Sequence, residues 1–111
     1  IKIKKSVVNL KKNKKIVCAI GASPRGCILL NTSNFSKNEI NFVGEIKGSF
    51  KLKKLIPGTN IPILNEKHLI NKKIDFIIIL AWHLKKRLRK TLVSNGYKGK
   101  FIVPLPNLKI S

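Results

Sequence analysis

The segment Ile16 to Gly26, IVCAIGASPRG, constrains the fold of this chain more than any other part of the sequence. It begins with an unbroken apolar run, which is typical of a parallel strand buried on both faces of a sheet. Gly21 then permits a turn that a Cβ would hinder, and Ser23 followed by Pro24 is typical of a helix N-cap with proline in the first turn. The segment therefore predicts a strand, a tight turn and a helix, the repeating unit of α/β folds.

The start of this predicted helix is a candidate phosphate site. The amides of a first helical turn have no partner within the helix, and together with the helix dipole they attract anions, so Arg25 would lie beside such a ligand. The segment is not a P-loop, because Cys27 and Ile28 stand where that loop needs lysine and then serine or threonine. It also lacks the third glycine of a dinucleotide fingerprint. A simple strand-to-helix turn without a ligand is the alternative.

Length and composition favour a single domain. With 111 residues, 43% of them hydrophobic, the chain can bury one core. We expect one domain over residues 1–111, made of a lead-in helix at 6–14 and an α/β core at 15–108. No apolar run approaches the roughly 20 residues of a spanning helix, and we expect a cytoplasmic protein. Cys18 and Cys27 lie in apolar surroundings and are predicted to be small buried hydrophobes without a disulfide or metal role.

The charge balance points to anionic partners. The chain has 24 lysines and arginines against 4 acidic residues, a formal net charge of +20. Such a potential attracts polyanions. However, lysine lacks the bidentate geometry of arginine, and the few aromatic residues do not alternate with the basic runs as a stacking surface requires. Non-specific nucleic-acid binding at low salt is expected, and an acidic neighbouring domain or an anionic ligand is the other interpretation.

The remaining apolar segments complete an alternating pattern. Strands are predicted at 16–20, 40–46, 61–64, 74–80 and 100–104, and helices at 6–14, 23–33, 65–70 and from Leu84 to just before Gly96. Short alternating units favour parallel strands. We predict an α/β, Rossmann-like fold with a mainly parallel five-stranded sheet and helices on both faces.

Further candidate ligand residues stand at predicted strand ends and in one loop. Glu45, at the tip of the second strand, could accept hydrogen bonds from a ribose or simply be an exposed strand end. Lys51 and Lys54 could neutralise an anion or belong to a solvated surface. Trp82 and His83 follow the fourth strand, where an indole could cover a base or sugar ring or pack against a neighbouring loop.

Five segments carry a resemblance to a known family. They are GASPRG at 21–26, LLN at 29–31, PGTNIPI at 57–63, ILAWHL at 79–84 and FIVPLP at 101–106. In order and spacing they resemble the C-terminal domain of the S-adenosylmethionine-dependent sugar C-methyltransferases, over nearly the whole chain. Proteins of this family join a small zinc-binding part, a methyltransferase domain and a Rossmann-like domain that helps hold a nucleotide-linked deoxysugar.

The resemblance implies that this chain is one part of a larger, multidomain protein. It places the acid/base residues and the S-adenosylmethionine site on absent domains, so we expect no catalytic residue, metal or cofactor within this chain. The expected ligand is a nucleotide-diphosphate sugar, and the expected partner is an adjacent methyltransferase domain. The strand ends and the family motifs together assign the following substrate-binding residues: Gly21, Ala22, Ser23, Arg25, Gly26, Asn31, Glu45, Lys51, Lys54, Pro57, Gly58, Thr59, Trp82 and His83.

Two rival functions stay open. One is a basic module that binds polyanions through its lysine surface, and the other is a structural or oligomerising domain without a ligand. Counterion release separates polyanion binding from a pocket-bound diphosphate, because only the former weakens steeply as salt rises.

Overall fold

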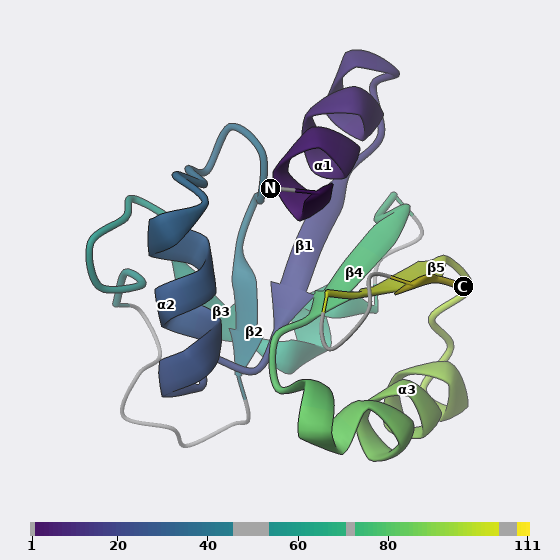
Figure 1. The fold of residues 1–111 in the computed structure, drawn as a ribbon. Helices are drawn as coiled ribbons and strands as arrows, with labels where there is room; N and C mark the ends of the chain where they lie inside the picture. The colour runs from purple at the N-terminus through teal and green to yellow at the C-terminus, as the bar shows by residue number, and fades with distance from the viewer. Residues whose placement is uncertain (1, 46–53, 71–72, 105–108) are drawn as a thin grey trace.

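The computed structural model describes residues 2–45, 54–70, 73–104 and 109–111 (Figure 1). The elements in chain order are α1 (Lys2–Lys12), β1 (Val17–Ile20), α2 (Pro24–Thr32), β2 (Val43–Glu45), β3 (Ile63–Asn65), the 3-10 turn η1 (Glu66–Leu69), β4 (Phe76–Ile79), the 3-10 turn η2 (Trp82–Leu84), α3 (Lys85–Ser94), β5 (Lys100–Val103) and β6 (Lys109–Ile110).

The sheet has the order β3-β2-β1-β4-β5-β6. The first five of these strands in the sequence are parallel to one another, which confirms the predicted α/β, Rossmann-like architecture. The short β6, which was not predicted, adds an antiparallel edge through the pairing of Ile110 with Ile102. Strands β2 and β3 lie on one side of β1, and β4, β5 and β6 lie on the other side. The carboxyl ends of β1 and β4 therefore form a topological switch point, where ligands of such sheets bind.

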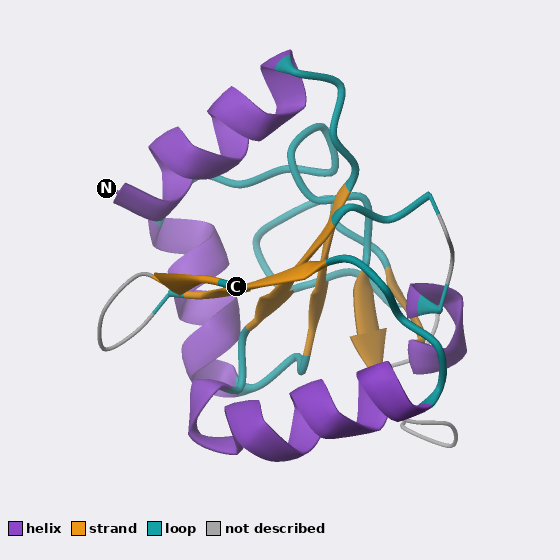
Figure 2. Cartoon of the chain, turned by 90° about the vertical axis from the view of Figure 1, so that its right-hand side faces the viewer, coloured by secondary structure: helices purple, strands orange, loops and turns teal. Residues whose placement is uncertain are grey.

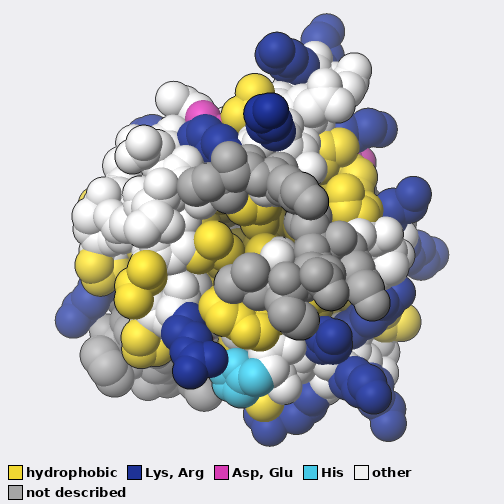
Figure 3. All heavy atoms as spheres, in the orientation of Figure 1, with side chains coloured by type: hydrophobic (Ala, Val, Ile, Leu, Met, Phe, Trp, Pro, Cys, Tyr) yellow, Lys and Arg dark blue, Asp and Glu magenta, His cyan; other side chains and the backbone are white. Residues whose placement is uncertain are grey.

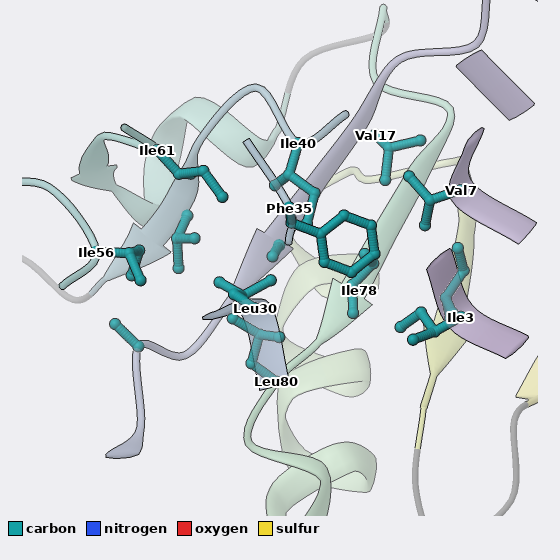
Figure 4. Close-up of a cluster of buried hydrophobic side chains, with 14 of the residues drawn as sticks. Ile3, Val7, Val17, Leu30, Phe35, Ile40, Ile56, Ile61, Ile78 and Leu80 are labelled. Carbon is teal, nitrogen blue, oxygen red and sulfur yellow. The ribbon is translucent and has the colours of Figure 1, made fainter. Parts of the chain in front are cut away.

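Helices cover both faces of the sheet, as predicted (Figure 2). On one face, Val17, Ile78 and Leu80 pack against α1 and α2 through residues such as Val7 and Leu30 (Figure 4). On the other face, alternate residues of the same strands pack with Leu92 of α3 and with Tyr97; they include Cys18, Ile20, Ile77 and Ile79. The central strands are buried on both faces, which explains why their sequences read as continuous apolar runs.

The first helix begins earlier than predicted. The expectation of a helix at 6–14 was wrong at its start, because α1 begins at Lys2. Ile3 precedes Val7 by one helical turn and extends the same buried stripe, so burial of that side chain stabilises an additional turn. The helix ends before Lys14, whose φ of 60° is incompatible with a right-handed helix.

The turn at Pro57–Asn60 is confirmed. Gly58 has a φ of 78°, and Ile56 donates its N–H to Ile61 O at 2.9 Å, closing the turn. The helix predicted at 65–70 is the short η1, with Asn65 as its N-cap accepting from Lys67 N. Strand β2 begins at Val43 rather than at the predicted residue 40, and Ile40 is buried in the loop before it. The predicted end at residue 46 lies outside the described residues.

Candidate functional site

The candidate site is the carboxyl edge of the sheet at the switch point between β1 and β4. Figure 1 shows that α2 and α3 both begin at this edge, the end to which the arrow of β1 points. The segment after β1 carries Ser23 and Arg25, and the segment after β4 carries Trp82 and His83. Hydrogen bonding between β1 and β4 fixes their relative position, so the two segments lie side by side.

Two glycines bring these segments close together. Gly21 has a φ of 87°, and a Cβ there would lie 3.0 Å from Ala81 Cβ. A Cβ on Gly26 would lie 2.7 Å from Leu80 Cβ, a distance that real Cβ contacts essentially never show. Gly21 and Gly26 were predicted to bind substrate. In the structure they have a packing role, because their lack of side chains lets α2 approach the end of β4.

Four backbone N–H groups of the Gly21–Gly26 turn have partners within the chain, and the first of them is that of Gly21, which donates to Gly44 O at 3.1 Å. Ser23 Oγ accepts the Gly26 N–H at 3.1 Å as the predicted N-cap, and Ser23 donates its own N–H to Gly21 O at 2.8 Å. Ala22 donates its N–H to Glu45 Oε1 at 2.9 Å. The sequence predicted unpaired amides in the first turn of the helix, but these four N–H groups are occupied by the N-cap, by Glu45 and by backbone oxygens. An anion could therefore bind these four N–H groups only if they gave up their present partners.

A cavity of about 390 Å³ lies between the two segments. Its lining residues are Ser23, Pro24, Arg25, Leu80, Trp82 and His83. Arg25 and His83 are exposed, whereas Trp82 is half-buried and packs into the core on the α3 side. The structure thus brings together the predicted residues Ser23, Arg25, Trp82 and His83.

A second cavity, of about 350 Å³, lies on the other side of Pro24. Ala22, Lys54 and Pro57, three of the predicted residues, contribute to its walls, and most of the remaining lining is apolar, including Cys27 and Leu55. Sequence reasoning missed this apolar hollow, because it forms only when the Pro57 turn folds against α2. Lys51 lies outside the described residues.

The other predicted residues of the Pro57 turn make hydrogen bonds within the chain. The side-chain amide of Asn31 donates to Pro57 O and, at 3.0 Å, to Cys27 O, which ties the turn to α2. A Cβ on Gly58 would overlap this Asn31 side chain. Thr59 Oγ1 donates to Ile56 O at 2.9 Å and accepts from Ile61 N at 3.1 Å. Asn31, Gly58 and Thr59 line neither cavity.

Glu45 lies at the end of β2 with its carboxylate directed to the turn after β1. Its hydrogen bond with Ala22 joins two neighbouring parallel strands at the edge where a ligand would approach. The sequence placed Glu45 correctly at a strand tip. It gave no sign of this hydrogen bond, which depends on the register Ile20–Gly44.

Most of the acidic side chains serve the fold. Of the four in the chain, Glu39 accepts the Ser36 N–H, Glu45 accepts the Ala22 N–H, and Asp75 accepts the Ile16 N–H, each at 2.8 to 2.9 Å. Glu39 also pairs with Lys4 at 3.2 Å. The 24 basic residues far outnumber the four carboxylates, and Figure 3 shows dark blue side chains widely spread over one face with little magenta.

Both cysteines are free thiols, and the predicted burial is confirmed for Cys18 only. Cys18 is buried in the core, and burial raises the pKa of its thiol to about 12, although a backbone hydrogen bond from Phe42 and the charge of Lys11 act in the opposite direction. Cys27 is half-buried at the apolar cavity. Among the described residues, no three histidine, cysteine or acidic side chains are grouped as metal ligands would be, and no helix is long and apolar enough to cross a membrane.

Comparison with known proteins identifies the family. A family model described as the C-methyltransferase C-terminal domain matches residues 2–106. The C-methyltransferase NovU of Streptomyces niveus is 30% identical over 99 residues, which cover 86% of this chain and 23% of that protein. The chain thus spans about a quarter of that relative. The match extends through α1 and through all five parallel strands, so it covers the whole carboxyl edge described above. This chain belongs to the family of C-methyltransferase C-terminal domains.

Proposed function

We propose that this domain helps to bind a nucleotide-diphosphate sugar at the switch point of its sheet. The observation that carries this proposal is the cavity of about 390 Å³ between the turn after β1 and the segment after β4. Its position agrees with the general rule for ligands of doubly wound sheets. Its walls offer a guanidinium, a hydroxyl, an imidazole and an indole, which suit a ligand with a charged part and ring-shaped parts.

Arg25 is the proposed partner of the diphosphate. Its guanidinium can form bidentate hydrogen bonds to phosphate oxygens, and the side chain is exposed at the start of α2, where the helix dipole also favours negative charge. Because four amides of the turn already have partners, we assign the side chain rather than the backbone to anion recognition. Lys54, across Pro24, is the proposed second cation, together with Lys51.

Trp82 is the proposed contact of the base or the sugar ring. The indole is half-buried and held by core packing on the α3 side, so its orientation is fixed before a ligand arrives. A fixed aromatic surface at a cavity wall can stack on a base or cover the apolar face of a sugar. His83, adjacent and exposed, can donate or accept a hydrogen bond at the same ligand.

Methyl transfer itself is proposed to take place on a methyltransferase domain outside this chain, with S-adenosylmethionine bound there. The cavity at the switch point does not fit that cofactor. S-adenosylmethionine carries a positively charged sulfonium, whereas the cavity is lined by Arg25, and the nearest strand-end carboxylate, Glu45, already accepts the Ala22 N–H. We therefore propose a substrate-holding, non-catalytic role for this domain.

The test is calorimetric titration of a pyrimidine diphosphosugar at physiological salt. Arg25→Glu removes the proposed phosphate contact and adds a repulsive charge, and the loss of a charge-assisted hydrogen bond of about 1.5–3 kcal/mol predicts at least tenfold weaker binding. Arg87→Glu on α3 is the matched control, since Arg87 is exposed and does not line the cavity, yet its replacement changes the net charge equally. Equal affinity of wild type and Arg25→Glu would refute the assignment.

A polyanion-binding surface is the second candidate function. The observation that favours it is the formal net charge of +20, which comes from 24 lysines and arginines against only 4 acidic residues. Binding of a short DNA duplex that weakens steeply as salt rises, with no competition by nucleoside diphosphates, would support this function over the first.

A further inference from the structure

A further cavity lies at the opposite edge of the sheet. It has a volume of about 700 Å³ and is formed where β1, β4 and β5 begin, with Ile70 and the segment Gly96–Lys100 completing its walls. Cavities of this size hold small organic molecules. None of its residues belongs to the carboxyl-edge site, so a ligand bound in this cavity would be independent of the proposed function.

The walls of this cavity are held in place by internal contacts. Asp75 Oδ2 accepts the Ile16 N–H at 2.8 Å, and Lys100 donates its N–H to Asp75 O at 3.0 Å, which joins the starts of the three strands. Tyr97 donates its hydroxyl to Lys100 O at 2.8 Å and lies edge-on to Phe101. A Cβ on Gly99 would overlap the Tyr97 hydroxyl, so the loop follows this path only with glycine.

The floor of the cavity is apolar. Ile74 and Tyr97 are only 6% and 4% exposed, and Ile70 is half-buried beside them. The Tyr97 hydroxyl stays neutral at ordinary pH, because burial raises its pKa, as do the nearby Cys18 and Asp75. Since this hydroxyl already donates to Lys100 O, the floor offers an apolar surface rather than a hydrogen-bonding one.

The rim is cationic. Lys15, Lys98 and Lys100 line the cavity, all three are exposed, and their ammonium groups form no hydrogen bond or ion pair with another described residue. The opposing charge in the wall is Asp75, one of whose oxygens accepts the Ile16 N–H. Three positive charges against one negative charge give the mouth of the cavity a positive potential, which attracts anions.

We propose that this amino-edge cavity binds a small organic anion with an apolar body. The anionic head, a carboxylate, sulfonate or phosphate, is bound by Lys15, Lys98 and Lys100, and the apolar body lies on Ile74 and Tyr97. Neither the lysine rim nor the apolar floor would bind a specific ligand alone. Exposed lysines bind inorganic anions weakly, and an apolar surface without polar groups does not discriminate between apolar ligands. The ligand class follows from the combination of the two surfaces around one cavity.

The probe is 8-anilinonaphthalene-1-sulfonate, an apolar body with one negative charge, titrated by fluorescence onto the folded protein at physiological salt. We expect one saturable site, and at least tenfold weaker binding to Lys98→Glu/Lys100→Glu, because two attractive charges become repulsive. The control is Lys37→Glu combined with Lys5→Glu, two exposed lysines outside the cavity lining, which makes the same change in net charge. This control should bind like wild type.

Three results would overturn the proposal. They are equal affinity of wild type and Lys98→Glu/Lys100→Glu, an equal loss in the Lys5/Lys37 control, and equally tight binding of the uncharged analogue 1-anilinonaphthalene. The neutral pair Lys98→Gln/Lys100→Gln provides a second variant should the glutamates disturb folding, and it is expected to bind with intermediate affinity. Thermal melting of each variant without probe shows whether the comparison is made between folded proteins.

Discussion

Gly26→Ala is the substitution that most directly tests how α2 is held against the sheet. In an ordinary helix, replacing glycine by alanine stabilises by roughly 0.5–1 kcal/mol, because glycine loses more backbone entropy on folding. At this position the new Cβ would lie 2.7 Å from Leu80 Cβ and 3.1 Å from Ser23 Oγ. Neither neighbour can move easily, since Leu80 is fully buried and Ser23 Oγ accepts the Gly26 N–H.

The close contact should outweigh the helix propensity. Overpacking of a tight site costs roughly 1–3 kcal/mol, so the net loss in free energy of unfolding is about 1–2 kcal/mol after the gain in propensity is subtracted. For a domain of this size, that corresponds to a melting temperature lower by roughly 4–12 °C. Ile28→Ala, at an exposed position of the same helix, is the control and should change the free energy by less than about 0.5 kcal/mol.

Thermal melting monitored by circular dichroism measures both variants. A melting temperature of Gly26→Ala equal to or above that of wild type would refute the close packing of α2 on the end of β4. It would also mean that the lack of a side chain at Gly26 is not what allows the turn after β1 to lie close to the segment that carries Trp82.

Two further predictions concern titrating groups. Burial opposes ionisation of Glu39, but the hydrogen bond from Ser36 and the ammonium of Lys4 outweigh this effect and lower the carboxyl pKa from its usual 4.5. Ionised Glu39 therefore stabilises the fold fully above pH 4.5, and this stabilisation is lost as pH falls through the folded pKa. The free energy of unfolding of Glu39→Gln, from thermal melting, should accordingly be lower than that of wild type by up to about 1 kcal/mol at pH 7, and the two should converge as pH falls through the folded pKa. A difference that does not change with pH would contradict this. Since burial raises the pKa of Cys18 to about 12, a thiol reagent at pH 8 should label the half-buried Cys27 first and Cys18 only on unfolding; equal rates would show that Cys18 is accessible.

Much of the fold could be predicted because the central strands are buried on both faces. Residues 16–20 and 74–80 read as apolar runs for that reason, and the N-cap at Ser23 is a local signal that the structure confirms. The position of Trp82 at a strand end followed directly from these elements. Local patterns of this kind were sufficient to predict the order of the elements and the edge of the sheet at which the candidate site lies.

The details that escaped prediction depend on contacts between distant segments. The hydrogen bond between Glu45 and Ala22 requires the register of β1 with β2, and the apolar cavity beside Cys27 requires the Pro57 turn to fold onto α2. The antiparallel β6 consists of two residues, too few for a periodic pattern. A pattern of residue types does not specify such partners, so the closed turn and the second cavity appear only in three dimensions.

The most direct test of the switch-point site uses the single tryptophan of the chain as its reporter. In a ¹H–¹⁵N correlation spectrum, the one indole N–H signal belongs to Trp82, which lines the cavity with Arg25. Titration with a pyrimidine diphosphosugar at physiological salt should shift this signal in a saturable manner. In Arg25→Glu the dissociation constant obtained from this shift should be at least tenfold higher. An indole signal that does not move while the ligand is bound elsewhere would contradict the proposed site.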